Sequence, residues 1–81
     1  MEPSFIQRLI TDGLPCAQIE VTGDGAHFDA LIVSAAFTDK GTLARHRLVY
    51  AALGGRMESG EIHALSMRTF TPEEWAAEAR G

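Results

Sequence analysis

The stretch Ile62-His63-Ala64-Leu65-Ser66-Met67-Arg68-Thr69-Phe70 decides the fold of this 81-residue chain. Its alternating side chains have the period of a half-buried strand. This strand follows a predicted helix rather than a tight turn. A strand reached through a helical crossover lies parallel to the strand that precedes the helix, and the crossover is right-handed. The sequence therefore predicts a sheet that contains a parallel pair of strands.

Two earlier strands are predicted to form a hairpin. Residues 17–22 alternate between apolar and polar side chains, as a strand with one buried face does. Gly23-Asp24-Gly25 is a tight-turn sequence. Residues 27–34 form the return strand, whose centre, Leu31-Ile32-Val33, indicates cover on both faces. We expect this return strand to be the one that lies parallel to the later strand.

Helices are predicted at both ends of the chain. Ser4 and Gln7 have the spacing of a capping box, and an apolar stripe follows them. Gly13 ends this first helix after roughly ten residues. Thr71 is the predicted N-cap of the last helix, with Glu74 at its capping-box position. Both helices should pack on the same small core.

The segment Arg45-His46-Arg47-Leu48-Val49-Tyr50 lies near the start of a middle helix, for which Thr42 is the predicted N-cap. The buried side of this helix is predicted to be Leu48, Val49, Ala52, Leu53 and Met57. Gly54-Gly55 either ends the helix early or permits close packing. The element order is α-β-β-α-β-α. We therefore predict a single α+β domain over residues 1–81, with a three-stranded mixed sheet.

Composition excludes several classes of protein. No apolar run approaches the ~20 residues of a membrane span, and charged residues interrupt any signal-peptide core. The one cysteine, Cys16, allows no intrachain disulfide, and we interpret it as a packing residue. The sequence has no P-loop, nucleotide fingerprint or nucleophile elbow. We expect a cytoplasmic protein that is not an enzyme.

Five segments, in their order along the chain, resemble the BolA family. They are Gly23-Asp24-Gly25-Ala26-His27-Phe28, Val33-Ser34 with Phe37, Arg45-His46-Arg47-Leu48-Val49-Tyr50, Ile62-His63-Ala64-Leu65 and Thr71-Pro72-Glu73-Glu74-Trp75. The likeness extends from about Phe5 to Trp75, and the compact hairpin is similar to that of short-loop, IbaG-type bacterial members. The resemblance implies a class II KH-like fold, which agrees with the predicted order of elements.

The resemblance also implies a role. BolA-family proteins pair with monothiol glutaredoxins and share a [2Fe-2S] cluster, with glutathione supplied by the glutaredoxin. In that role they act in iron–sulfur cluster trafficking, iron homeostasis and stress responses. Some members are also described as DNA-binding transcriptional regulators. The sequence leaves open whether the free chain forms a homodimer.

Two histidines are candidate cluster ligands through this resemblance. His63 is the family's histidine, and imidazole replaces thiolate at one iron of a Rieske centre. From the residues alone, the favoured role of His63 is that of a half-buried strand residue that shares a face with Leu65 and Met67, and the resemblance reverses this preference. His27, directly after the hairpin turn, is the nearest candidate for a second ligand. Its alternative role is structural, with the imidazole hydrogen-bonded across the hairpin.

A basic cluster, consisting of Lys40, Arg45, His46 and Arg47, is the candidate surface for a protein partner or a nucleic acid. His46 lies between two arginines and is interpreted as a surface residue rather than a metal ligand. Against nucleic acid stand the net charge of −4 and the missing Gly-x-x-Gly loop of KH domains. A small DNA-binding regulator is therefore the alternative to the glutaredoxin partner.

Overall fold

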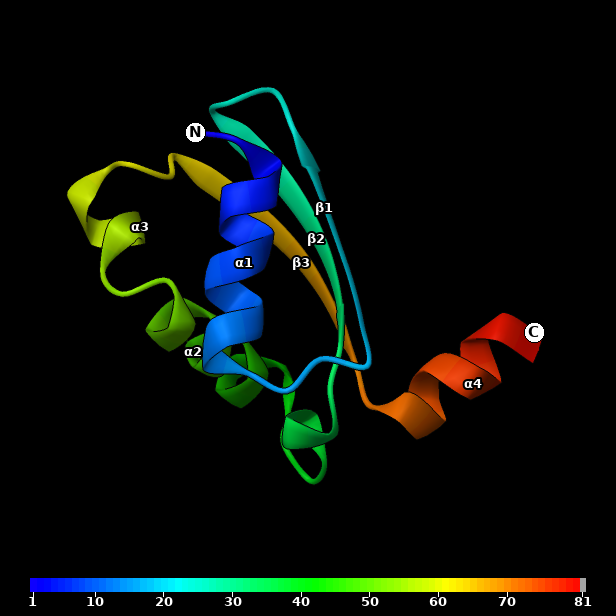
Figure 1. Cartoon of the computed structure of the whole chain (residues 1–81). Coiled ribbons are helices and arrows are strands. Elements are labelled where there is room, and N and C mark those ends of the chain that lie inside the picture. Colours follow the sequence, from blue (N-terminus) through cyan, green and yellow to red (C-terminus); the bar gives the residue numbers. More distant parts are fainter. Residues whose placement is uncertain (81) are drawn as a thin grey trace.

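A three-stranded sheet forms the centre of the protein, whose computed structural model describes residues 1–80 (Figure 1). Strands β1 (Gln18–Gly23) and β2 (His27–Val33) are antiparallel, and β3 (Ala64–Phe70) pairs in parallel with β2. The strand order is β1-β2-β3. These pairings confirm the predicted hairpin and the mixed sheet, although β3 begins at Ala64, two residues later than expected.

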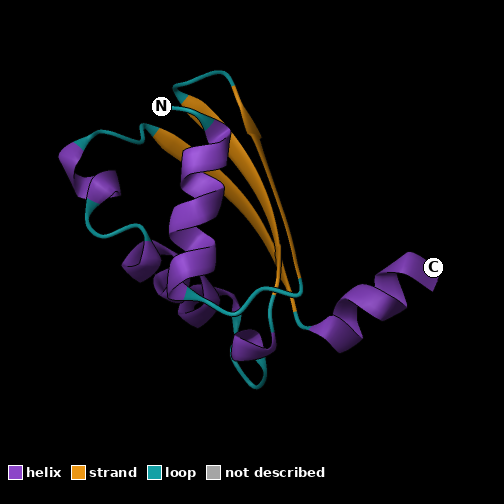
Figure 2. Ribbon diagram, viewed as in Figure 1, coloured by secondary structure: helices purple, strands orange, loops and turns teal. Residues whose placement is uncertain are grey.

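Helices cover one face of this sheet (Figure 2). They are α1 (Pro3–Gly13), α2 (Thr42–Ala52) and the short α3 (Arg56–Ser59), with a 3-10 turn, η1 (Ala35–Phe37), before α2. Alternate side chains of β2 point toward them. The buried core is formed by Ile6, Ile10, Leu14, Val21, Phe28, Ala30, Ile32, Phe37, Val49, Leu53 and Ile62. The predicted α+β architecture is confirmed.

Helix α4 (Pro72–Arg80) differs from the other helices because it extends from the end of β3 on the opposite side of the sheet (Figure 1). None of its residues is buried, so the prediction that the last helix packs on the same core as the first is wrong. The predicted capping box is present: the Glu74 N–H donates to Thr71 Oγ1 at 3.1 Å, and the Thr71 N–H donates to Glu74 Oε1 at 2.8 Å. The Trp75 ring packs against Phe70, with ring centroids 5.3 Å apart.

Helix α1 ends at Gly13, as predicted, but its start differs from the predicted one. Glu2 is the N-cap residue, Pro3 occupies the first turn, and no side chain caps the helix. The Ser4–Gln7 capping box is therefore wrong, because Pro lacks an N–H and suits the first helical position, which leaves Ser4 inside the helix. At Gly13 an added Cβ would lie 2.7 Å from the Cβ of Ala52. Close approach between α1 and α2 thus requires glycine there.

Helix α2 is shorter than the apolar pattern suggested. Gly41 holds the N-cap position, so Thr42 is the first helical residue rather than the cap. Gly54 and Gly55 have φ angles of +62° and +82°, a left-handed conformation that ends the helix at low cost only for glycine. Met57 consequently lies in α3. Of the two roles considered for the glycine pair, the early end is correct. Among residues 1–80, no helix is long and apolar enough to cross a membrane.

Candidate functional site

The two candidate ligands, His27 and His63, lie at the same end of the sheet. His27 opens β2 and is paired in register with Ala64, the first residue of β3. His63 directly precedes Ala64, whose N–H donates to the carbonyl of Ala26 at 3.3 Å. Both histidines are exposed to solvent. The parallel pairing of β2 and β3 therefore brings together two residues that are far apart in the sequence.

The hairpin turn fixes the backbone at His27. Asp24 Oδ1 accepts hydrogen bonds from the N–H groups of His27 at 2.9 Å and Ala26 at 3.0 Å. These N–H donors hold the pKa of the Asp24 carboxyl below its usual value. Gly25 has a φ of +102°, and a Cβ on Gly23 would collide with the Phe28 ring and the His27 carbonyl. The Gly-Asp-Gly sequence is thus required by the turn that positions His27.

A buried residue anchors the chain just before His63. Ile62 is 1% exposed, and its N–H donates to the carbonyl of Arg56 at 3.3 Å. Arg56 also pairs with Glu61, with Nε 3.5 Å from Oε2. The next residue, His63, lies outside β3 and points into solvent, while Leu65 within the strand is half-buried. The half-buried role considered for His63 is therefore wrong.

Within residues 1–80 neither imidazole ring has a hydrogen-bond partner or an ion pair. The alternative in which the His27 ring bonds across the hairpin is not observed, since only its backbone takes part in the turn. Imidazole nitrogen is a known ligand of iron, since a histidine pair binds one iron of a Rieske cluster.

The described part of the chain holds no set of three or more His, Cys, Asp or Glu side chains that could bind a metal ion. Cys16 does not add to the histidine pair, because it precedes β1 at the opposite end of the sheet. Its thiol bonds weakly to the carbonyl of Leu14, and burial raises its pKa, which disfavours the thiolate. Cys16 is thus a structural residue, as predicted. Any cluster at His27 and His63 needs further ligands from another molecule.

The basic cluster does not form one surface, because Arg45 is used inside the protein. Its Nε donates to the carbonyl of Lys40 at 2.7 Å, and Nη1 donates to the carbonyl of Thr69 at 3.1 Å. Its two Nη atoms bind the Glu74 carboxylate at 2.7 and 3.1 Å. The guanidinium also lies 5.7 Å from the centre of the Phe37 ring. With 12% of its side chain exposed, Arg45 was wrongly predicted to lie on an exposed surface.

Two of the remaining members of the basic cluster face solvent, and His46 does so only in part. Lys40 and Arg47 are exposed, and neither forms a salt bridge within residues 1–80. His46 is half-buried against Tyr50, with ring centroids 6.5 Å apart. Leu43 is 64% exposed on the same side of α2, as the spacing of three and four residues dictates. This exposed leucine could not be predicted from the sequence, because an apolar residue in a helix is expected to be buried.

Comparison with known proteins agrees with the arrangement of these elements. A model of the family described as BolA-like protein matches residues 12–74. The chain belongs to the BolA family. The acid stress protein IbaG of Escherichia coli is 31% identical over 80 residues, which cover 99% of this chain and 95% of IbaG. The crystal structure of a Bol-like protein from Babesia bovis superposes with a TM-score of 0.86 at 36% identity, covering 99% and 95% of the two chains.

A second kind of BolA-family relative is the DNA-binding transcriptional regulator BolA of Haemophilus influenzae. It is 41% identical over 56 residues, covering 69% of this chain and 53% of the regulator. The BolA-family match over residues 12–74 includes both exposed histidines and both members of the Arg45–Glu74 ion pair. The family therefore shares the part of the chain that contains the candidate ligands and the part that attaches α4.

Proposed function

We propose that this protein is a non-enzymatic partner of a monothiol glutaredoxin and shares a [2Fe-2S] cluster with it, in iron–sulfur cluster trafficking and iron homeostasis. The observation that carries the proposal is the pair of exposed imidazoles, His27 and His63, at one end of the sheet. The described residues provide no third ligand beside them. The BolA-family resemblance supports a monothiol glutaredoxin as the partner, which would contribute the remaining ligands and glutathione.

Two histidine ligands suit a cluster that is transferred to another protein. Neutral imidazole donates less electron density than thiolate, so a histidine-bound iron is held less tightly than one in a four-cysteine site. The two histidines also require no internal rearrangement before binding, because their rings have no partners to give up among residues 1–80. This protein's contribution is thus to present two nitrogen ligands on a rigid strand end.

The test is an anaerobic titration of a cluster-loaded monothiol glutaredoxin with this protein, followed by visible absorption and circular dichroism. We expect a new spectrum at a one-to-one ratio. His63→Ala should abolish the new spectrum, and His27→Ala should change or weaken it. His46→Ala is the matched control, since His46 lies on α2 and should leave the spectrum unchanged.

A parallel titration with the cluster-free glutaredoxin separates metal sharing from plain association. If both forms bind equally and His63→Ala has no spectral effect, the protein is an interaction module that does not bind the cluster. Failure to form any heterodimer would contradict the glutaredoxin assignment itself.

A second candidate function is DNA binding, favoured by the exposed, unpaired Lys40 and Arg47 and by the printed name of the Haemophilus influenzae relative. Binding through these cations should weaken as salt rises, because each neutralised phosphate releases counterions. We expect Lys40→Gln with Arg47→Gln to flatten that salt dependence in a mobility-shift titration of duplex DNA. Arg45 is not part of this test, because its guanidinium binds Glu74. Absence of a shift at moderate ionic strength would eliminate this function.

A further inference from the structure

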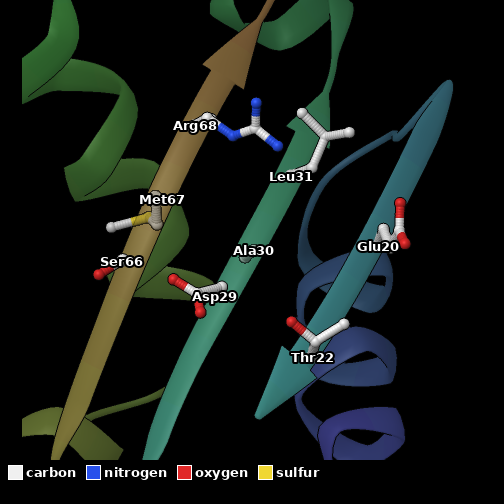
Figure 3. Close-up of a pocket in the computed structure, with 8 residues that line it drawn as sticks. All are labelled: Glu20, Thr22, Asp29, Ala30, Leu31, Ser66, Met67 and Arg68. Atoms are coloured by element: carbon white, nitrogen blue, oxygen red, sulfur yellow. The ribbon is translucent and has the colours of Figure 1, made fainter.

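His63 lies between two segments of chain that are attached to the protein in different ways. On its carboxyl side, every residue of β3 from Ala64 onward is paired in register with β2. The side chains of β3 lie beside those of the central strand, as Arg68 does beside Leu31 on the face turned away from α1 (Figure 3). The segment after His63 is therefore fixed by the hydrogen bonds of the sheet.

On its amino side, His63 follows a segment with little support of its own. Residues 54–61 include no buried residue. Within this segment, α3 has four residues and is flanked by Gly55 and Gly60, whose φ angles are +82° and +84°. A segment with few buried contacts opens easily unless its side chains attach it to the rest of the protein. Two side chains do so: Met57 packs against the core, and Arg56 makes polar contacts.

The Arg56 side chain contacts three parts of the chain. Its Nη1 donates to the carbonyl of Leu53, the C-cap residue of α2, at 2.9 Å. The guanidinium lies 5.6 Å from the centre of the Phe5 ring on α1, which is within the range of a cation–π contact. Its Nε is buried without a hydrogen bond within residues 1–80, and a Glu61 carboxylate oxygen lies 3.5 Å away. Arg56 thus joins both long helices to a residue two positions before His63.

We propose that Arg56 is a positioning residue for His63. Its side chain holds α3 and the following turn against α1 and α2, and its carbonyl accepts the N–H of Ile62 at 3.3 Å. The pair with Glu61 and the hydrogen bond with Ile62 act on the two residues that precede His63. They therefore restrict where the imidazole lies at the end of the sheet. The proposal rests on the proposed function only for the role of His63 as a cluster ligand.

The first experiment measures the backbone ¹⁵N order parameter of His63 by NMR in the full, metal-free chain. We expect a rigid value of about 0.85 in the natural chain and a flexible value below about 0.6 in Arg56→Gln. The order parameter of His27 should stay unchanged, because the Asp24 side chain and the sheet hold its backbone. Lower stability alone does not produce such a difference between two histidines of a folded chain.

Arg56→Lys is a second variant, which also serves if Arg56→Gln does not fold. Lysine keeps the positive charge but lacks the planar fork. It cannot bond to the Leu53 carbonyl and pair with Glu61 together, so the order parameter of His63 should be intermediate. Arg8→Gln is the matched control, because Arg8 is exposed on α1 and forms no salt bridge within residues 1–80. It should leave both order parameters unchanged.

The second experiment repeats the titration of a cluster-loaded glutaredoxin with these variants. Removing residues that orient a metal ligand lowers metal affinity by about 10- to 100-fold. Arg56 acts through Glu61 and Ile62 rather than on the imidazole itself, so we expect Arg56→Gln to weaken cluster binding by about ten-fold. The spectrum at saturation should match that of the natural chain, because both histidines remain.

Three results would overturn the proposal: a flexible His63 in the natural chain, an unchanged His63 order parameter in both Arg56 variants, or an unchanged cluster affinity in a variant whose His63 is flexible. The second result, with a lowered unfolding free energy, would make Arg56 a structural residue only. His63→Ala separates this proposal from the proposed function. If His63→Ala leaves the cluster spectrum unchanged, the proposed function fails, whereas the first experiment still decides whether Arg56 positions His63.

Discussion

The guanidinium of Arg45 joins three parts of the chain: the loop before α2, the end of β3 and the first turn of α4. Only arginine has a planar fork that reaches two carbonyls and both oxygens of a carboxylate at once. Glu74 is the centre of this arrangement, since it also accepts the Thr71 N–H in the capping box. Glu74 therefore has two roles: with Thr71 it caps α4, and with Arg45 it attaches α4 to the rest of the protein.

This ion pair predicts how stability depends on pH. The side chain of Arg45, followed by the N–H of Thr71, lowers the pKa of Glu74 from 4.5 to about 2. A carboxyl with a lowered pKa stabilises the folded state fully above its unfolded pKa and loses that effect as pH falls through its folded pKa. We expect the difference in unfolding free energy between the natural chain and Glu74→Gln to shrink between pH 4.5 and about 2. Urea titrations across this range measure it.

A matched comparison is Glu78→Gln, on the same helix and also exposed, with no salt bridge within residues 1–80. The difference in unfolding free energy between Glu78→Gln and the natural chain should not change over the same pH range. A Glu74→Gln difference that is equally flat would mean that the ion pair contributes nothing in solution.

At the level of elements, sheet order and helix order followed from the sequence, whereas helix ends often did not. Alternation and the crossover rule are set by backbone geometry, so the hairpin and the parallel β3 could be predicted. Ser4 and Thr42 fit N-cap statistics, but Pro3 and Gly41 begin their helices differently. Competition between neighbouring residues for one cap position is not visible in composition. It is decided by how each helix packs.

The packing of α1 against α2 can be tested by measuring the stability of a substitution at their contact. Gly13→Ala places a Cβ 2.7 Å from the Cβ of Ala52, and neither methyl group can rotate away. We expect a loss of roughly 1–3 kcal/mol in unfolding free energy, the usual cost of overpacking. Denaturant unfolding measures it.

Ala52→Gly removes the opposing methyl group and serves as the rescue variant. Gly13→Ala should cost clearly less in that background, although Ala52→Gly itself costs about 1 kcal/mol in a helix. Strictly additive losses would show that the two helices do not meet as described.

In the whole molecule, the two ends of the sheet carry different groups of residues. One end carries His27 and His63, and the other carries the attachment of α4 through Arg45 and Glu74. The family resemblance made both histidines candidates, and the register explains why they lie at the same end of the sheet. The internal position of the Arg45 guanidinium could not be predicted, because the residue that binds it, Glu74, is 29 positions away in the sequence.

Because the two ends of the sheet lie far apart, we expect a substitution at one end to leave the structure of the other end unchanged. Arg45→Ala removes a charged hydrogen-bond donor, and we expect it to lower the unfolding free energy by about 1–2 kcal/mol. The imidazole NMR signals of His27 and His63 should nevertheless keep their positions, because a seven-residue strand places them roughly 20 Å away. Arg47→Ala, on the exposed side of α2, is the control for stability and should change it by less than about 0.5 kcal/mol. Shifted histidine signals would reveal coupling along the sheet.

The parallel pairing of β2 with β3 also has a consequence for the order of folding. The β1–β2 hairpin needs only local contacts, whereas His27 and Ala64 are partners across 64 − 27 = 37 positions. Contacts of long sequence separation form late, because the intervening chain must first be closed into a loop. During synthesis the hairpin therefore offers a single histidine until most of the chain has emerged. The two candidate ligands come together only when the sheet is complete, so a nascent or truncated chain that stops before β3 lacks half of the proposed site.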